Sequence, residues 1–260
     1  MTMQAFAAVG SGGLVGFLLG LVGGGGSILA TPLLVYAVGV VPPHVAIGTG
    51  ALAVSVNAFA NFAGHALRGH VWWRCALVFA ALGTLGAYGG SSLGKAVDGR
   101  HLLVLFGLLM LAVGLLLLRR RPAGAAAPRP VDRRMCALTA LVALAAGAAS
   151  GFFGIGGGFL IVPGLVFATG MPMINAVGTS LLAVGAFGLA TALNYAASGL
   201  VDWALAAEFI GGGLAGGLAG TALATRLGGR RDLLSRLFAA LVLTAAAYVL
   251  YRSIGDLSAG

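Results

Sequence analysis

One glycine-rich pattern occurs twice in this chain: residues 20–32 read GLVGGGGSILATP, and residues 151–163 read GFFGIGGGFLIVP. Both copies lie inside long apolar runs with no charged residue close by. Glycine permits backbone angles that other residues avoid and leaves neighbouring amides uncovered, so four glycines within five positions predict an interrupted helix. In hydrocarbon, an interrupted helix is tolerated only where protein or a water-filled cavity surrounds the freed backbone groups. The pattern therefore predicts two broken helices that face each other at a polar site.

The composition is that of an integral membrane protein. Of the 260 residues, 60% are hydrophobic and 8% are charged, and the mean hydropathy is +1.04, which a soluble core of this size does not need. The net charge of +9 comes from basic residues that lie between apolar segments and lack interleaved aromatic residues. This pattern argues against nucleic acid as a partner and is explained by the positive-inside rule.

The apolar runs predict an all-α membrane protein with about 8–10 membrane segments, because each half contains five apolar stretches, of which the first two are broken by glycine or form a re-entrant hairpin. The second segment is short, because a helix with Thr31 as N-cap and Pro32 in its first turn has only ten residues before Pro42, whereas a helix that begins at Ser27 would be kinked at Pro32. We expect a first membrane repeat over residues 1–118, a basic linker over 119–134 and a second membrane repeat over 135–260. The expected segments are Met3–Val22, Ser27–Val41, Val45–Ala66, Val71–Leu93, Leu102–Leu118, Met135–Phe153, Phe159–Thr169, Ile174–Ala197, Trp203–Thr225 and Leu233–Tyr251.

The two halves repeat each other in sequence. At an offset of 131 residues Gly20 and Pro32 meet their own type, and at an offset of 130 residues Pro42, Thr49 and Trp73 do the same. Apolar composition alone does not place glycine, proline, threonine and tryptophan in one register. An internal duplication is therefore a strong prediction.

The charges predict that the two repeats are inverted relative to each other. If the arginine-rich linker is cytoplasmic, counting segments leaves only Lys95, Arg100 and Arg252 of the 15 basic residues outside. Equivalent loops then lie on opposite sides, which requires an odd number of net crossings in each half. Five full crossings and three crossings plus a re-entrant hairpin both satisfy this condition. In either case we expect a multi-pass protein of the plasma (inner) membrane with both termini in the periplasm.

The doubled motifs resemble the TauE/SafE family of membrane transporters. The resemblance depends on the glycine motifs that end at Pro32 and Pro163, on GTG at residues 48–50 with GTS at 178–180, and on GHVWW at 69–73 with GLVDW at 199–203. It covers nearly the whole chain except the linker and the termini. It implies transport of a small anion, in characterised members often a sulfur-containing one such as sulfite or an organosulfonate, without selecting one substrate.

The candidate site residues are those that can hold an anion without a buried positive charge. Uncovered amides at a helix N-terminus bind anions, and hydroxyl groups can orient them. The alternative for the glycines is close helix packing, and the alternative for the hydroxyl groups is hydrogen bonding between helices. Glu208 is the only carboxylate within an apolar segment and is a candidate for proton coupling. The candidate substrate-binding residues are Gly25, Gly26, Ser27, Thr49, Gly156, Gly157, Gly158, Thr179 and Ser180.

These features favour a secondary transporter that moves a small anion by alternating access. An anion channel with the same fold and a non-transporting membrane subunit are the alternatives. An integral membrane enzyme is disfavoured, because the sequence contains no paired carboxylates, no metal-ligand spacing and no nucleophile with a base. We therefore expect no cofactor and no metal, and as partners a small anionic solute, the lipid bilayer and a proton or another coupling ion.

Overall fold

The protein is a bundle of helices in a computed structural model that describes residues 3–119, 133–171, 173–226 and 231–258. Every regular element in these ranges is helical, which confirms the predicted all-α membrane fold. The long helices are α1 (Met3–Val22), α3 (Pro43–Leu67), α4 (Trp73–Ala96), α5 (Gly99–Arg119), α6 (Arg133–Phe153), α8 (Met173–Ala196), α9 (Trp203–Arg226) and α10 (Arg231–Ser258). The short elements are the 3-10 helix η1 (Gly24–Leu29), α2 (Ala30–Pro32), the π-helix η2 (Leu33–Ala37) and α7 (Gly158–Thr169).

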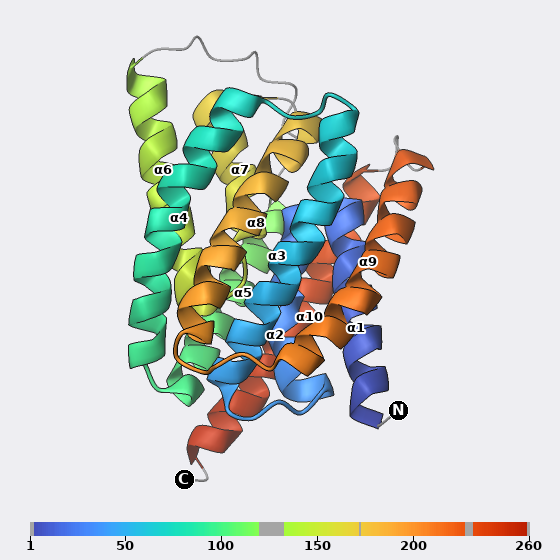
Figure 1. The fold of residues 1–260 in the computed structure, drawn as a ribbon, viewed down its shortest axis with the longest axis vertical. Coiled ribbons are helices and arrows are strands. Elements are labelled where there is room, and N and C mark those ends of the chain that lie inside the picture. Colours follow the sequence, from blue (N-terminus) through green and yellow to red (C-terminus); the bar gives the residue numbers. More distant parts are fainter. Residues whose placement is uncertain (1–2, 120–132, 172, 227–230, 259–260) are drawn as a thin grey trace.

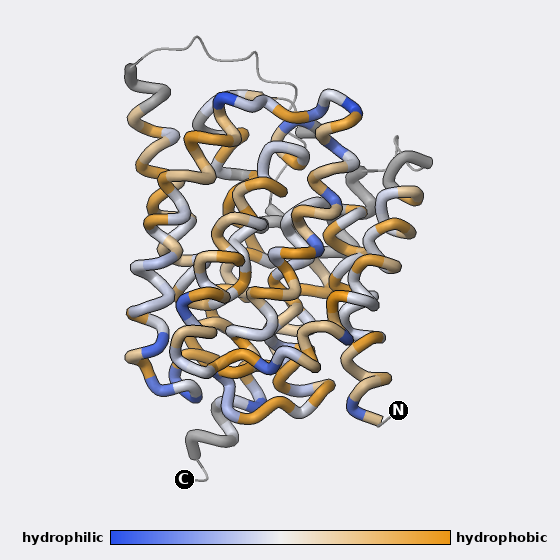
Figure 2. Tube along the Cα trace, viewed as in Figure 1, coloured by the Kyte–Doolittle hydropathy of each residue, from blue (hydrophilic) through white to orange (hydrophobic). Residues whose placement is uncertain are grey.

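The outer surface of the bundle suits a lipid environment. Leu85, Leu93 and Leu218 are 68%, 66% and 76% exposed, and Figure 2 shows hydrophobic residues along the body of the bundle with hydrophilic residues mostly near its two ends. A helix of about 20 apolar residues spans the hydrocarbon core. Among the described residues, five helices are long and apolar enough to do so: Met3–Leu21, Pro43–Leu67, Trp73–Ala96, Gly99–Leu116 and Asn175–Ala196.

The helices of the two sequence halves are interleaved. α1 packs along α9, and α6 packs along α4, while α3 pairs with α8 and α5 with α10. α1 begins and α10 ends at the lower end of the bundle in Figure 1, whereas α6 begins at the upper end. Residues 120–132, which include most of the expected linker, lie outside the described part of the chain.

Small residues bring these cross-half pairs into backbone contact. A Cβ placed on Gly90 of α4 would collide with the carbonyl of Ala148 on α6, and a Cβ on Gly216 of α9 would collide with the carbonyl of Gly13 on α1. The same holds for the residues one turn away on either side, so glycine ridges let the helices approach closely. The glycines at 86, 90 and 94 and at 212, 216 and 220 therefore form packing faces.

The second segment begins earlier than either prediction. Its 3-10 turn starts at Gly24, becomes α-helical at Ala30 and widens to a π-helix after Pro32, with Val38 N donating to Leu33 O at 3.0 Å. Proline lacks an amide proton and its ring crowds the preceding turn, so a continuous helix can pass through it only with altered bonding. Thr31 therefore lies inside the helical segment, and the prediction that it is an N-cap is wrong.

Candidate functional site

Both glycine stretches interrupt their helices, as predicted. α1 ends at Val22 and Gly23 has a φ of +81°, while α6 ends at Phe153 and is followed by Gly154, Gly156 and Gly157 with φ values of +66°, +64° and +65°. Residues with a side chain rarely adopt these angles. We call residues 23–27 the first break and residues 154–158 the second break.

The two breaks touch each other in the interior of the bundle. A Cβ on Gly24 would lie 2.6 Å from the Cα of Gly158, and a Cβ on Gly158 would collide with the backbone of Gly24. Gly23 packs on Val177 of α8, and Gly154 packs on Ile47 of α3, so each break also contacts the third segment of the other half. The expectation that the broken segments face each other is confirmed by these contacts.

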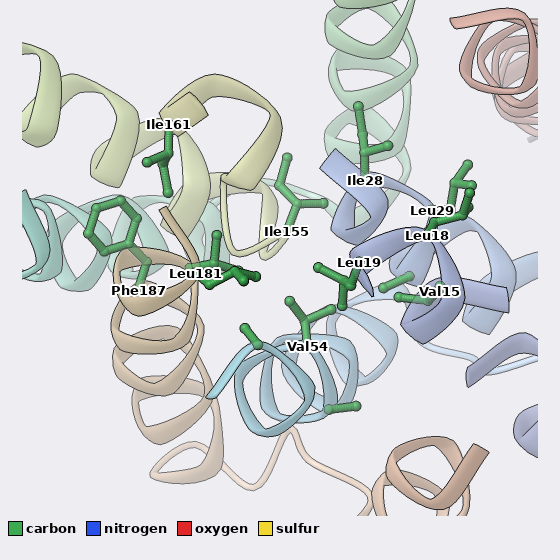
Figure 3. Close-up of a cluster of buried hydrophobic side chains, with 14 of the residues drawn as sticks. Val15, Leu18, Leu19, Ile28, Leu29, Val54, Ile155, Ile161, Leu181 and Phe187 are labelled. Atoms are coloured by element: carbon green, nitrogen blue, oxygen red, sulfur yellow. The ribbon is translucent and has the colours of Figure 1, made fainter. Parts of the chain in front are cut away.

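Apolar side chains surround much of this meeting point. Figure 3 shows Leu19, Val54, Ile155 and Leu181 pointing toward a common centre from α1, α3, the second break and α8. A Cβ on Gly156 would lie 3.0 Å from Cγ1 of Val54. A polar solute at this position would therefore depend on the main chain and on a few hydroxyl groups for its hydrogen bonds.

The second break carries unused hydrogen-bond donors. The amides of Gly156 and Gly157 donate to no acceptor among the described residues, and Gly158 opens α7, where helical geometry leaves the first amides unpaired. The hydroxyl of Ser150 is fully buried without a hydrogen-bond partner and would lie 2.9 Å from a Cβ on Gly157. Buried polar groups normally have partners, so this group of donors is the strongest indication of a ligand site in the paired breaks.

The first break uses more of its donors internally. Gly26 N donates to Gly23 O at 3.3 Å, and the hydroxyl of Ser27 donates to Gly24 O at 2.8 Å. Gly25 is buried at the start of the 3-10 turn. The two breaks are thus unequal.

Thr49 and Thr179 hold loops of the opposite half. The Oγ1 of Thr49 accepts from Asp202 N at 3.0 Å just before α9, and the Oγ1 of Thr179 accepts from Trp72 N at 3.1 Å just before α4. The two contacts are equivalent in the repeat register. The hydroxyl of Ser180 donates to Val177 O at 2.8 Å. The threonine oxygens therefore fix loop positions, while each hydroxyl proton can still be donated.

Comparison with known proteins agrees with this architecture. The family model described as "Sulfite exporter TauE/SafE" matches residues 8–249. The chain belongs to this family. It is 62% identical over 264 residues to a "Probable membrane transporter protein" of Xylella fastidiosa strain Temecula1, and the match covers all of both chains. It is 27% identical over 206 residues to the "Probable membrane transporter protein YdhB" of Bacillus subtilis, covering 78% of this chain and 83% of that one. No solved structure matches the chain.

The protein is therefore a membrane transporter of the TauE/SafE family, and its relatives bear the name of transporters. Glu208 lies in the second turn of α9, is partly exposed and has no hydrogen bond or ion pair with the described residues. Among the described residues no three histidine, cysteine, aspartate or glutamate side chains are placed to hold a metal ion.

Several buried polar groups of this TauE/SafE transporter have no hydrogen-bond partner among the described residues. Ser150 stands in a run of alanine and glycine, and its repeat equivalent is Leu19, so no pattern marked it. Thr31 is 1% exposed, and within the described part of the chain neither its hydroxyl nor the two polar atoms of the buried Asn57 have a hydrogen-bond partner. Missing hydrogen bonds are a tertiary property, which the sequence does not reveal.

Proposed function

We propose that this transporter moves a small anion across the plasma membrane by alternating access, and that its substrate is a sulfur-containing oxyanion or an organosulfonate. The observation that supports an anionic substrate comes from the second break. There the unpaired amides of Gly156 and Gly157 lie beside the buried, unpartnered hydroxyl of Ser150. Such donors at a helix N-terminus favour negative charge without a buried cation. The description of the family supports a sulfur-containing substrate.

Within this proposal the second break is the main binding element. Gly156, Gly157 and Gly158 donate from the backbone, while Gly25, Gly26 and Ser27 close the site from the first break. Thr49, Thr179 and Ser180 are assigned to the rim, where a hydroxyl proton is available to the solute as it enters or leaves. These roles are proposals that rest on burial and on unpaired donors.

We also propose that residues 1–118 and 135–260 are inverted repeats that rock about the paired breaks. Support comes from the shared end of the two termini and from the opposite directions of α1 and α6 in Figure 1. The equivalent bonds of Thr49 and Thr179 add a local two-fold relation. Inverted repeats around broken helices are a common basis of alternating access.

The proposed orientation places the basic linker in the cytoplasm and both termini in the periplasm of a bacterial-type inner membrane. The loop between α3 and α4, the start of α6 and the end of α9 lie at one end in Figure 1, and most of the basic residues lie close to these points in the sequence. The positive-inside rule assigns that end to the cytoplasm. A periplasm-dependent reporter fused at either terminus is expected to be active, and activity of a cytoplasm-dependent reporter there would contradict the inverted topology.

Counterflow in proteoliposomes tests the transport proposal. We expect unlabelled sulfite or sulfoacetate trapped inside vesicles to drive uptake of the labelled anion, with empty vesicles as the control. A channel would show flux without counterflow, and a non-transporting subunit would show neither. A preceding thermal-shift screen with sulfite, sulfate, thiosulfate, sulfoacetate and common carboxylates selects the anion, because a bound ligand stabilises the state that it binds.

Glu208 is proposed as the coupling residue if transport depends on protons. An ionisable group within a membrane segment is a functional candidate by default. Glu208→Gln is then expected to abolish the stimulation of uptake by an imposed pH gradient while counterflow of the anion continues. Unchanged stimulation would remove Glu208 from the mechanism.

A further inference from the structure

Asn57 lies in the middle of α3 with its carboxamide fully buried and unused. Neither its nitrogen nor its oxygen has a hydrogen-bond partner in the part of the chain that the structure describes. Asn194, the other asparagine that is more than nine-tenths buried among the described residues, donates to Ser91 Oγ at 2.6 Å and to Ser92 Oγ at 2.9 Å. A buried amide without partners is costly, so it is kept where something outside the polypeptide completes its bonds.

The internal repeat shows that packing alone does not require an amide here. At the offset of 130 residues Asn57 corresponds to Phe187, which is fully buried and stacks on Phe79 with ring centroids 6.2 Å apart. A Cβ on Gly83 would collide with the ring of Phe187, and a Cβ on the equivalent Gly213 would lie 2.6 Å from Cγ of Asn57. An aromatic ring thus fills one position, and a smaller polar group occupies its counterpart.

The amide of Asn57 lies one helical turn from the paired breaks. Val54 is three residues earlier on α3, on the same side of the helix, and contacts Gly156 in the second break. On the other side, Gly213 of α9 lies against the backbone of Gly16 on α1, the helix that leads into the first break. Asn57 is therefore next to the breaks on the apolar side of the meeting point.

Asn61, one turn further along α3, is already satisfied. Its Nδ2 donates to Asn57 O at 2.8 Å, and its Oδ1 accepts from the hydroxyl of Thr221 at 3.1 Å. This pair joins α3 to α9 and needs no ligand. Of Asn57 and Asn61, only Asn57 therefore has a side-chain donor and acceptor that a ligand could use.

We propose that Asn57 is a side-chain contact of the transported anion and that it selects a singly protonated oxyanion. This inference rests on the proposed function. A carboxamide presents both N–H donors and a carbonyl acceptor, so its complement carries an acceptor oxygen and a proton. A fully ionised oxyanion would satisfy the N–H group and leave the carbonyl facing negative charge. Recognition by a neutral amide also avoids a buried charge after the solute has left.

The test uses purified full-length protein and sulfite in thermal-shift and equilibrium binding measurements. Asn57→Leu, of similar volume, is expected to keep or raise the melting temperature without ligand, because an unpaired amide is removed, and to weaken sulfite binding about tenfold or more. Thr221→Val is the matched control, because it breaks the neighbouring part-buried bond between α3 and α9. It is expected to lower the melting temperature and to leave the affinity unchanged.

Two outcomes would overturn the inference while the transport proposal stands. One is an unchanged affinity of a folded Asn57→Leu variant, which would mean that Asn57 only holds a water molecule. The other is equal affinity of the wild-type protein for sulfite on the acid and alkaline sides of its second ionisation, since we expect weaker binding on the alkaline side. If no screened anion binds the wild-type protein, the proposed function fails as well. If Asn57→Leu does not fold, Asn57→Ser takes its place with the same expectations for binding.

Discussion

At the scale of single residues, Gly158 is a position of the paired breaks where backbone packs on backbone. A Cβ there would collide with the backbone of Gly24, which cannot move aside as a side-chain end can. We expect Gly158→Ala to destabilise the protein by about 1–3 kcal/mol and to reduce anion uptake strongly, since overpacking forces the backbone to shift. Gly89→Ala on α4 is the control, because no atom lies within 4 Å of its Cβ position. A melting temperature and uptake rate equal to those of the control would contradict the contact.

Single-residue features that depend on the local backbone could be predicted from the sequence, whereas those that depend on tertiary contacts could not. The breaks at Gly23 and Gly157 were predictable, because clustered glycines act on their own backbone. The unpaired hydroxyl of Ser150 was not, because it depends on which side chains fail to reach it after folding. For Thr49 and Thr179 the sequence predicts only that the two positions are equivalent in the repeat. Their hydrogen bonds to the loops of the opposite half are seen only in the folded structure.

At the scale of the elements, the loops before α4 and α9 are held by one threonine each. We expect Thr49→Val with Thr179→Val to lower the free energy of unfolding by about 1 kcal/mol per lost bond. Because Thr49→Ser with Thr179→Ser keeps both hydroxyl groups, it should restore most of the stability. A melting temperature that is the same for the valine and serine pairs would show that the two bonds contribute nothing. A change in anion affinity in the valine pair alone would support their place at the rim of the site.

Long apolar runs made most of the helices predictable, and one irregular element was missed. α1 ends at Val22 and α6 at Phe153, as expected from the glycines that follow them. The segment around Pro32 differs, because the sequence does not say whether a proline ends a helix or is absorbed by a wider turn. α7 has 12 residues and a length of about 18 Å at 1.5 Å per residue, short of the hydrocarbon core. Its length favours a re-entrant hairpin over a full crossing in the second half.

At the scale of the whole molecule, the sequence predicts two repeats but not how they interlock. The small-residue face of α1 in the first half packs on α9 in the second half, and that of α6 in the second half packs on α4 in the first half. Each half alone would therefore leave such a face without its partner helix. The division between the two repeats in the sequence therefore does not separate two domains in the folded protein. Charges and periodicity locate the segments along the chain and assign their ends, whereas the partner of each ridge is decided by three-dimensional packing.

This interlocking makes a prediction about a chain that is cut within residues 119–134. We expect residues 1–124 and 125–260, expressed together as two polypeptides, to copurify in mild detergent and to retain anion binding. The pairs α1–α9, α4–α6, α3–α8 and α5–α10 all cross the cut, so the halves are held by packed interfaces rather than by the linker. Each half expressed alone should be degraded or aggregate, because its glycine ridges and the inner faces of α3 or α8 are then exposed to lipid. Recovery of a folded single half, measured by its melting transition and by monodisperse elution, would mean that each repeat is an independent domain.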